Sequence, residues 1–323
     1  MSGLSKVPAV TKQSVAEAGA GQRVDNYLMR VCRGVPKSHL YRILRRGEVR
    51  VNGRRVDADF RLSEGDEVRI PPIRIATVTA PVAHARALRP IPVLFEDDAL
   101  LVLDKPAGRA VHGGSGISHG VIEQLRAERP EAKFLELVHR LDRDTSGVLL
   151  LARKRSALTA MHARLRAGEV RKTYLALVSG RWREAERRIE LPLHKFVTPE
   201  GERRVAVRAD GKPAVSRVRL LRRWRNFSLL EVELETGRTH QIRVHLAHLG
   251  FPILGDEKYG DFALNRKLAK AGLKRMFLHA TELAFLHPLR GEPMRARADL
   301  PEDLRAFLGR VEANEAEDHE AAP

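Results

Sequence analysis

Residues Phe134–Lys154 read FLELVHRLDRDTSGVLLLARK, a polar segment enclosed by two apolar runs. Each flanking run is rich in leucine and valine and has the length of a buried strand. The segment between them, HRLDRDTSG (His139–Gly147), gathers charged side chains that packing alone does not require. In an extended chain Arg140 and Asp142 point to one side and Leu141 to the other. The stretch therefore predicts a carboxylate and a guanidinium that emerge together near the end of a strand.

The sequence on both sides of this stretch predicts a mixed sheet with helices on its faces. VLFEDDALLVLDKP (93–106) and KTYLALVSG (172–180) have the β-branched and leucine-rich character of strands, whereas SALTAMHARLRAG (156–168) has the period of an amphipathic helix. We expect an α+β protein in which a small N-terminal α/β module precedes a large domain with a mixed or antiparallel sheet.

The expected boundaries follow from where the regular patterns begin and end. Residues 21–72 form the small module and residues 91–311 the large domain. Residues 1–20 and 73–90 lack a clean period and are predicted to be a flexible leader and a linker. Residues 312–323 carry five acids and no lysine or arginine, which favours a disordered, solvated tail.

Composition limits the functional classes. The 323 residues include 58 Lys and Arg against 41 Asp and Glu, a formal net charge of +17, which points to a polyanionic partner such as nucleic acid. A hydrophobic content of 43% excludes wholesale disorder. The single cysteine, Cys32, excludes an internal disulfide and a cysteine-rich metal site. No apolar run approaches the roughly 20 residues of a membrane helix, and the N-terminus lacks a secretory signal, so we expect a cytoplasmic protein without a membrane partner.

The small module has strong local signals. Apolar residues at helical spacing predict one helix within residues 23–32 and another within residues 38–47, the second with Ser38 as its N-cap and Gly47 as its stop. Asn52-Gly53 predicts a tight hairpin turn, and GDEVRIP (65–71) a further strand.

Basic residues cluster on the second helix and the hairpin of this module. Arg42, Arg45 and Arg46 recur at helical spacing and share one face. Such a stripe beside a hairpin suits a phosphate backbone, although an ordinary solvated helix face has the same pattern. The residues that we expect to contact RNA are Lys37, Arg42, Arg45, Arg46 and Arg50.

At these positions the module resembles the S4 RNA-binding module. The matching residues are Arg23-Val24-Asp25, the segment Gly47–Gly53 (GEVRVNG) and Gly65-Asp66. The resemblance covers about fifty residues and implies RNA as the partner. It implies no chemistry.

Two further segments of the large domain concentrate polar residues. RKTY (171–174) opens a predicted strand and ends with Tyr174. In ETGRTHQIRVHLAHLG (235–250), Thr236 or Thr239 can cap a helix, which places Arg238, His240 and Gln241 at its positive N-terminal end and Arg243 one turn further along.

Several chemistries can be tested against these residues. The histidine spacing around His240 does not match a known zinc motif, and no serine lies in a G-x-S-x-G elbow, so neither a metal site nor a hydrolytic triad is expected. His112–Gly120 lacks the lysine of a P-loop and reads as a turn. What remains is a carboxylate flanked by arginines, which suits nucleophilic or general-base chemistry by Asp142. By spacing alone, a structural Arg–Asp pair is equally compatible.

The three motifs H-R-L-D-x-x-T-S-G, K-x-Y and G-R-T-H-Q-I-R-x-H together resemble the pseudouridine synthases of the ribosomal large-subunit group, and KPAGRAVHGG (105–114) is most similar to class C of that group. The resemblance implies that Asp142 acts covalently on a uridine, at C1′ of the ribose or C6 of the base, two routes that stay open. It further implies that Tyr174 stacks on the uracil and can take a proton, that Arg243 pairs with Asp142, and that Arg140 fills the place of the flipped uridine.

The same resemblance implies the remaining site and partner assignments. The substrate-binding residues would be Arg140, Arg238, Thr239, His240 and Gln241, and no metal or small-molecule cofactor would be needed. The expected partner is large-subunit (23S) rRNA or its assembly intermediates, bound by a monomer. A synthase acting on tRNA or small-subunit rRNA, and a non-catalytic RNA-binding or ribosome-assembly factor, are the alternatives.

Overall fold

A four-stranded sheet with two helices forms the core of the first of two units, Met1–Ala87 and Leu88–Pro323, in the computed structural model. The structure describes residues 10–16, 19–32, 35–73, 89–113 and 120–320. In the first unit, α1 (Val24–Val31) and α2 (Lys37–Arg45) bury their apolar faces against a sheet in the order β1-β4-β2-β3. The strands of this sheet are β1 (Thr11–Ser14), β2 (Arg50–Val51), β3 (Arg54–Arg55) and β4 (Glu67–Ile70).

The local signals of this unit are confirmed with one exception. Asn52 and Gly53 both adopt positive φ angles, 49° and 77°, as a two-residue turn between β2 and β3 requires. Gly47, at φ 69°, follows the end of α2. The predicted cap was wrong: α2 begins two residues earlier than a cap at Ser38 would place it, with Pro36 in the N-cap position, so Ser38 lies inside the helix. A proline already holds the φ angle needed at a helix start, and the side chain of Pro36 forms no capping hydrogen bond.

The expectation of a flexible leader over residues 1–20 was wrong in part. Thr11–Ser14 form β1, which pairs antiparallel with β4, and Val15 is buried in the core of the unit. Four residues at the edge of a sheet are too few to produce a recognisable period, which is why the sequence did not reveal this strand. Most of the expected linker, residues 74–88, lies outside the described residues.

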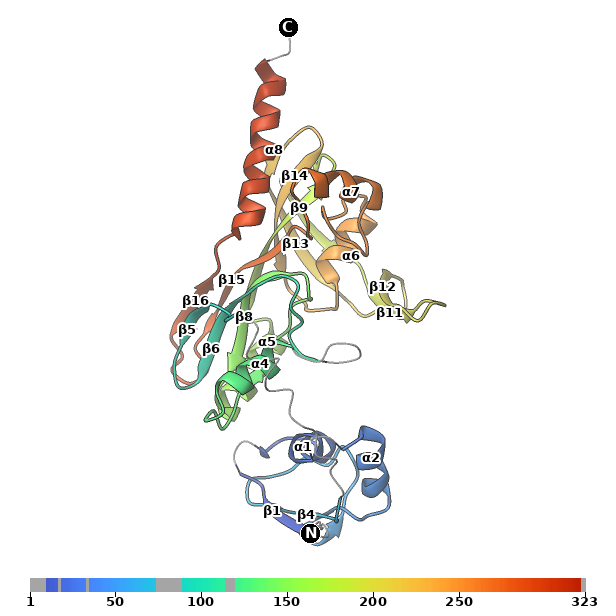
Figure 1. Cartoon of the computed structure of the whole chain (residues 1–323), viewed down its shortest axis with the longest axis vertical. Coiled ribbons are helices and arrows are strands. Elements are labelled where there is room, and N and C mark those ends of the chain that lie inside the picture. Colours follow the sequence, from blue (N-terminus) through green and yellow to red (C-terminus); the bar gives the residue numbers. More distant parts are fainter. Residues whose placement is uncertain (1–9, 17–18, 33–34, 74–88, 114–119, 321–323) are drawn as a thin grey trace, which may run out of the picture. The chain divides into compact units, whose positions relative to one another are not determined.

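A ten-stranded mixed sheet is the centre of the second unit (Figure 1), and the α+β expectation is confirmed. Its main path runs β10-β13-β14-β9-β15-β8-β6-β5, with β16 paired to β15 and β7 paired to β8, and β11 and β12 form a separate hairpin. The strands are β5 (Val93–Glu96), β6 (Leu100–Lys105), β7 (Glu136–Leu137), β8 (Ser146–Ala152), β9 (Arg171–Ser179), β10 (Glu186–Glu190), β11 (Leu193–Val197), β12 (Arg203–Val207), β13 (Val215–Arg223), β14 (Phe227–Leu234), β15 (Leu278–Leu286) and β16 (Pro293–Arg297).

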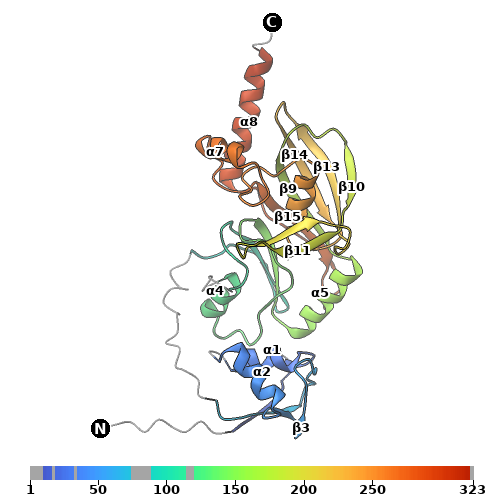
Figure 2. The same ribbon diagram turned by 90° about the vertical axis from the view of Figure 1, so that its right-hand side faces the viewer.

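Different helices cover the two faces of this sheet. Alternate residues of β9 and β14, such as Ala176 and Val232, pack in one core cluster with α4 (Val121–Glu128) and α6 (Gln241–His248). The intervening residues, such as Leu177, pack in a second cluster with α7 (Phe262–Lys270) and α8 (Glu302–Glu320). Helix α5 (Arg155–Ala167) follows β8 directly. The hairpin β11–β12 projects on the side of α6, and α8 extends past the end of the sheet (Figures 1 and 2).

Strand β15 joins β8, the strand that follows the polar motif, to β9, the strand that carries Tyr174. Although it is one of the last strands in sequence, β15 lies between β9 and β8, antiparallel to the first and parallel to the second. At the contact with β8, Gly147 has a φ of 109°, and a Cβ atom there would lie 2.1 Å from the carbonyl oxygen of Ala280. The glycine that ends the motif is therefore required by backbone geometry and by close approach.

The expectation of a disordered tail over residues 312–323 was wrong for most of its length, because α8 continues to Glu320. Alanine and glutamate are strong helix formers, and this segment extends a helix already anchored by buried Leu304, Phe307 and Val311. Within the described ranges, no helix is both long and apolar enough to cross a membrane.

Candidate active site

Asp142 lies in the loop between β7 and β8 and forms an ion pair with Arg243 of α6. The Oδ2 atom of Asp142 accepts a hydrogen bond from Nη1 of Arg243 at 3.1 Å, across 101 positions of sequence. The side chain of Asp142 is 18% exposed and that of Arg243 only 8%. The two motifs that carry these residues therefore meet in space, with the carboxylate on the solvent side of the pair.

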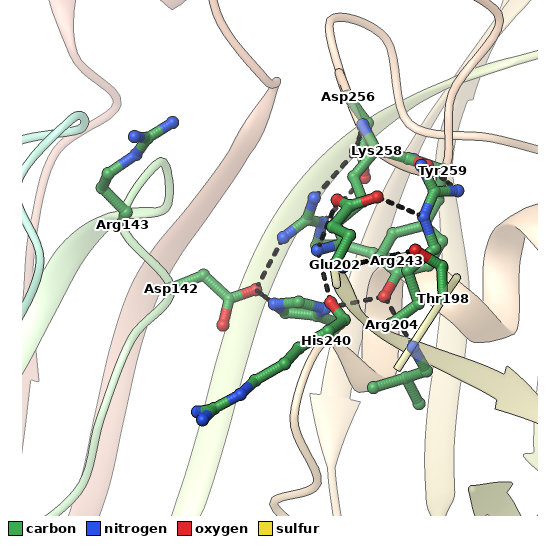
Figure 3. Close-up of polar contacts among 12 residues, drawn as sticks. Asp142, Arg143, Thr198, Glu202, Arg204, His240, Arg243, Asp256, Lys258 and Tyr259 are labelled. Carbon is green, nitrogen blue, oxygen red and sulfur yellow. Dashed lines mark hydrogen bonds and ion pairs between the residues drawn. The ribbon is translucent and has the colours of Figure 1, made fainter. Parts of the chain in front are cut away.

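A second carboxylate holds Arg243 from behind. Asp256, which is buried, accepts from Nε and Nη2 of Arg243 at 2.8 Å each, and also accepts the backbone N–H groups of Lys258 and Tyr259 (Figure 3). Burial raises the pKa of Asp256, but the hydrogen bonds and charge of Arg243, with the two N–H groups, outweigh it and leave this pKa below its ordinary value. Arg243 is thus fixed between two carboxylates and presents an N–H group of Nη1 to Asp142.

His240, the N-cap residue of α6, lies beside the same carboxylate. Its Nε2 atom is 3.9 Å from Oδ2 of Asp142, and its Nδ1 atom is 2.8 Å from the hydroxyl of Tyr259 (Figure 3). The residue adopts a left-handed conformation with φ 53°, which non-glycine residues rarely take. The expectation that Thr236 or Thr239 caps this helix was wrong, since His240 stands in the N-cap position.

Tyr174 is on β9, in the core cluster that also contains Leu141 and Ile242. It is 7% exposed. Burial, and secondarily the negative charge of Asp142, raises the pKa of its phenol well above the ordinary value. The phenol therefore stays protonated at neutral pH.

A buried lysine anchors the loop that carries Asp142. Lys105, at the end of β6, is fully buried and donates to the carbonyl oxygens of Pro106, Arg109 and Arg143 at 2.8–3.0 Å. Burial lowers its pKa to about 7. Because Arg143 follows Asp142 directly, this contact fixes the backbone at the carboxylate.

The remaining sequence-predicted residues of the large domain divide into two groups. Arg140, Arg238, Thr239 and His240 line the hollow next to Asp142. Gln241 is 2% exposed, and its amide is engaged with Thr236, Arg238, Val215 and Ser216. A side chain with this many protein partners braces the start of α6.

Two hollows meet at the Asp142–Arg243 pair. The smaller, of about 340 Å³, reaches Tyr174 and the turn that carries Arg238, and the larger, of about 930 Å³, is bordered by the Asp256 loop and β12. The cations on their walls include Arg140, Arg203 and Lys274, whose side chains form no ion pair or hydrogen bond with any other described residue. They are therefore available for an anionic ligand beside Asp142.

The basic residues predicted on the small unit are exposed. They are Lys37, Arg42, Arg45, Arg46 and Arg50. Leu40, Ile43 and Leu44 of α2 are buried, which confirms that the arginines share the opposite face. The R-V-D motif has a structural role here: buried Asp25 accepts from Arg23 and from the hydroxyl of Tyr41 and so ties α1 to α2.

His245, in contrast to His240, serves the fold. His245 is fully buried between the hydroxyl of Ser216 and the carbonyl oxygen of Leu191. Across the described part of the chain, no group of three or more His, Cys, Asp and Glu residues is arranged to hold a metal ion. Residues 114–119, which form most of the glycine-rich segment His112–Gly120, lie outside the described residues.

Comparison with known families agrees with this geometry. Residues 99–248 match the model of the RNA pseudouridylate synthases, and residues 22–68 match that of the S4 domain. The chain belongs to the RNA pseudouridylate synthase family, whose members convert uridine in RNA to pseudouridine.

Two relatives illustrate how far the similarity extends. The chain is 51% identical over 306 residues to ribosomal large subunit pseudouridine synthase C of Yersinia pestis, covering 93% of this chain and 95% of the relative. It is 50% identical over 314 residues to the enzyme of the same name from Escherichia coli K12, covering 95% and 98%. Among solved structures, human RNA pseudouridylate synthase domain containing 4 superposes with a TM-score of 0.58 at 25% identity, covering 72% of this chain and 96% of that one.

Three residues of the site were missed by sequence reasoning. Asp256 and Tyr259 lie in GDEKYG (255–260), and Lys105 in the K-P-A-G segment. The sequence does carry a signal for Asp256 and Tyr259. A carboxylate and a tyrosine lie between two glycines shortly after a predicted helix, a pattern typical of a loop with polar functional groups. Nothing in the sequence says that this loop reaches back to Arg243.

Proposed function

We propose that the protein isomerises specific uridines to pseudouridine in the RNA of the large ribosomal subunit, with Asp142 as the covalent catalyst. The observation that carries this proposal is the unequal environment of the Asp142 carboxylate. Its Oδ2 atom is held by Arg243 and faced by His240, while Oδ1 has no hydrogen-bond partner among the described residues. Oδ1 is therefore the oxygen free to attack a uridine.

The substrate assignment rests on the relatives and on the small unit. Both curated relatives described above are named large-subunit synthases and match almost the whole chain, including the S4 domain. The exposed arginines of α2 supply phosphate contacts that add affinity without reading the base sequence. In this proposal the enzyme acts as a monomer and needs no cofactor.

Arg243 and Tyr174 would act on either side of the attacking group. Arg243 orients Asp142 through its hydrogen bond to Oδ2, and Asp256 prevents Arg243 from turning away. Tyr174 presents an aromatic ring and a protonated phenol at the wall of the smaller hollow, where a flipped uracil can stack. When Oδ1 bonds to the uridine, an electron pair passes to the uracil, either because the C1′–N1 bond breaks or because addition at C6 converts the C5=C6 double bond into an enolate, so the negative charge moves from Asp142 to the ring. The protonated phenol of Tyr174 lies at the wall of the same hollow and can donate a hydrogen bond to the charged ring.

The unpaired cations would hold the RNA strand around the flipped nucleotide. Arg140 lies in the same loop as Asp142 and is exposed, so its side chain can enter the space that the uridine leaves. Arg203 and Lys274 on the larger hollow are placed to contact phosphates. Gln241 is assigned a positioning role at the start of α6 in place of the substrate contact expected from the sequence.

The test is pseudouridine mapping on defined RNAs. The purified protein and its Asp142→Asn variant are incubated separately with transcripts of 23S rRNA, 16S rRNA and tRNA, and pseudouridine is located by carbodiimide modification and reverse transcription. We expect stops at discrete positions in 23S rRNA with the parental protein alone. Product from the Asp142→Asn variant would refute the role of Asp142, and product confined to tRNA or 16S rRNA would refute the substrate. Binding without product on any RNA would favour an assembly factor.

A further inference from the structure

Tyr259 connects the hairpin β11–β12 to the histidine beside Asp142. Its hydroxyl accepts the backbone N–H of Val205 on β12 at 3.0 Å and lies 2.8 Å from Nδ1 of His240. The ring of Tyr259 also contacts the edge of the His240 ring, with centroids 5.5 Å apart, and carries the guanidinium of Arg243 over its face at 5.1 Å. No other partner of this hydroxyl occurs among the described residues. These contacts place one phenol against both groups that face Oδ2 of Asp142.

The hydrogen bonds at Tyr259 determine which nitrogen of His240 carries the proton. Because the hydroxyl oxygen already accepts from Val205, its own hydrogen is best donated to Nδ1 of His240, which must then be unprotonated. A neutral imidazole with a bare Nδ1 carries its proton on Nε2. The other tautomer would leave the phenol hydrogen without a protein acceptor in a half-buried position, which costs free energy.

The other end of the ring favours the same tautomer. Nε2 of His240 faces Oδ2 of Asp142 at 3.9 Å. An N–H group there points its positive end at the carboxylate, whereas a lone pair would be repelled by it. Tyr259 on one side and Asp142 on the other therefore select the same protonation site.

We propose that Tyr259 is a positioning residue that keeps the proton of neutral His240 on Nε2, so that His240 and Arg243 both direct donors at Oδ2 of Asp142 and leave Oδ1 as the reacting atom. This inference rests on the proposed role of Asp142 as the nucleophile. It assigns a function to a residue of the GDEKYG segment that lies 117 positions after Asp142 in the sequence, outside every motif used to locate the site.

The charges around His240 are consistent with a neutral ring. Burial lowers its pKa to about 4; the charges of Asp142 and Asp256 oppose this shift, and those of Arg243 and Lys258 reinforce it. Burial also raises the pKa of Tyr259, so the phenol keeps its hydrogen at neutral pH. Both partners are thus in the protonation states that the tautomer argument requires.

The first experiment reads the tautomer directly. Protein labelled with ¹⁵N at histidine is examined by long-range ¹H–¹⁵N correlation, with the His240→Gln variant identifying the resonances of His240. We expect the Nε2–H form in the parental protein and a mixture of both neutral tautomers in Tyr259→Phe, which keeps the ring but lacks the hydroxyl. An Nδ1–H form in the parental protein, or an unchanged Nε2–H form in Tyr259→Phe, would overturn the proposal. This readout requires no RNA, so it stands apart from the proposed function.

The second experiment measures single-turnover pseudouridine formation on a 23S rRNA transcript at saturating enzyme. We expect Tyr259→Phe to lower the rate about tenfold while RNA affinity stays within about twofold, because the hydroxyl orients a catalytic group and touches no phosphate. A rate within twofold of the parental value would overturn the positioning role. Absence of product from the parental protein would count against the proposed function and leave the tautomer result in force.

Two further variants separate positioning from loosening of the hairpin. Glu202→Gln weakens the ion pairs of Glu202 with Lys258 and Arg204 and leaves Tyr259 intact, so its rate should be near the parental one. In His240→Gln the side-chain amide offers a donor near the position of Nε2 without needing Tyr259. Adding Tyr259→Phe to His240→Gln should therefore change the rate less than twofold. A full tenfold further loss in that background, or an equal loss in Glu202→Gln, would show that Tyr259 acts by another route.

Discussion

Replacing Asp256 by asparagine removes the charge that compensates Arg243 on its buried side. Asparagine is nearly the same size, and its carbonyl oxygen can still accept the backbone N–H groups of Lys258 and Tyr259. What it cannot do is match the fork of Arg243, whose Nε and Nη2 both donate to Asp256 at 2.8 Å. One donor of Arg243 would then face an amide that is itself a donor. We expect a large loss of stability from this single change.

The magnitude follows from the burial of the pair. The side chains of Arg243 and Asp256 are 8% and 1% exposed. Unit charges about 4 Å apart attract by about 4 kcal/mol at an effective dielectric constant of about 20. Breaking a buried pair by removing one partner costs about 3–5 kcal/mol. Because Asp142 still compensates part of the charge of Arg243, we expect the lower end, a decrease of about 3 kcal/mol in the free energy of unfolding of the second unit.

Intrinsic fluorescence isolates this unit within the full chain. The protein has two tryptophans, Trp182 and Trp224, and both are buried in the second unit. Urea unfolding followed by their emission therefore reports on that unit alone, and we expect Asp256→Asn to shift the midpoint at constant slope. A decrease below about 1 kcal/mol would refute the argument that Asp256 compensates a buried charge.

A second variant and the pH dependence test the same reasoning. If the loss comes from uncompensated Arg243, then Arg243→Met should cost little further stability in the Asp256→Asn background. Since the folded-state pKa of Asp256 is lowered, its contribution is present above its unfolded pKa of about 4 and is lost as the pH falls through the folded value. The difference between parental and variant proteins should therefore shrink below about pH 4. A difference that grows with acidification would contradict the assigned direction.

Four further changes test other parts of the molecule. Asp142→Asn should abolish pseudouridine formation and leave RNA affinity, measured by filter binding, within about tenfold, since the phosphate contacts are untouched. Tyr174→Phe should keep RNA binding and lose pseudouridine formation in a single turnover; full activity would show that the hydroxyl has no catalytic role. Arg45→Gln combined with Arg46→Gln should flatten the slope of log affinity against log salt by up to about 0.9 per lost contact on a duplex, without changing the rate at saturating enzyme. Gly147→Ala should lower the thermal midpoint of the second unit and the activity together; a parental midpoint would contradict the close approach seen in the structure.

Local signals predicted the small unit well because its structure is decided by neighbours in sequence. The turn at Asn52-Gly53 and the stop at Gly47 each depend on a few adjacent residues, and both were confirmed. β1 escaped notice because its only support is pairing with β4, more than fifty residues later. The helix over residues 312–320 was missed because its acidic residues were interpreted as a sign of disorder, although alanine and glutamate are strong helix formers.

The large domain shows the same division between local and distant information. Motifs placed Asp142, Tyr174 and Arg243 near one another, and the structure brings Asp142 and Arg243 into contact. Asp256 and Tyr259 could not be assigned, because their function arises from a loop that returns to the start of α6. The sequence also did not reveal the partners of Gln241: it lines the smaller hollow, and its amide bonds to backbone and side-chain groups of its own fold.

Because β15 lies between β8 and β9, the large sheet can be completed during synthesis only after β15 has been made. Residues 278–286 leave the ribosome after both strands that they join, and until they arrive the strand after Asp142 and the strand bearing Tyr174 have nothing between them. A chain that stops before Leu278 carries every recognised motif, including the S4 domain and Arg243, yet its sheet stays in two halves. Such a nascent or truncated product would hold RNA-binding residues without an assembled catalytic centre. Activity on RNA therefore requires a chain that includes β15.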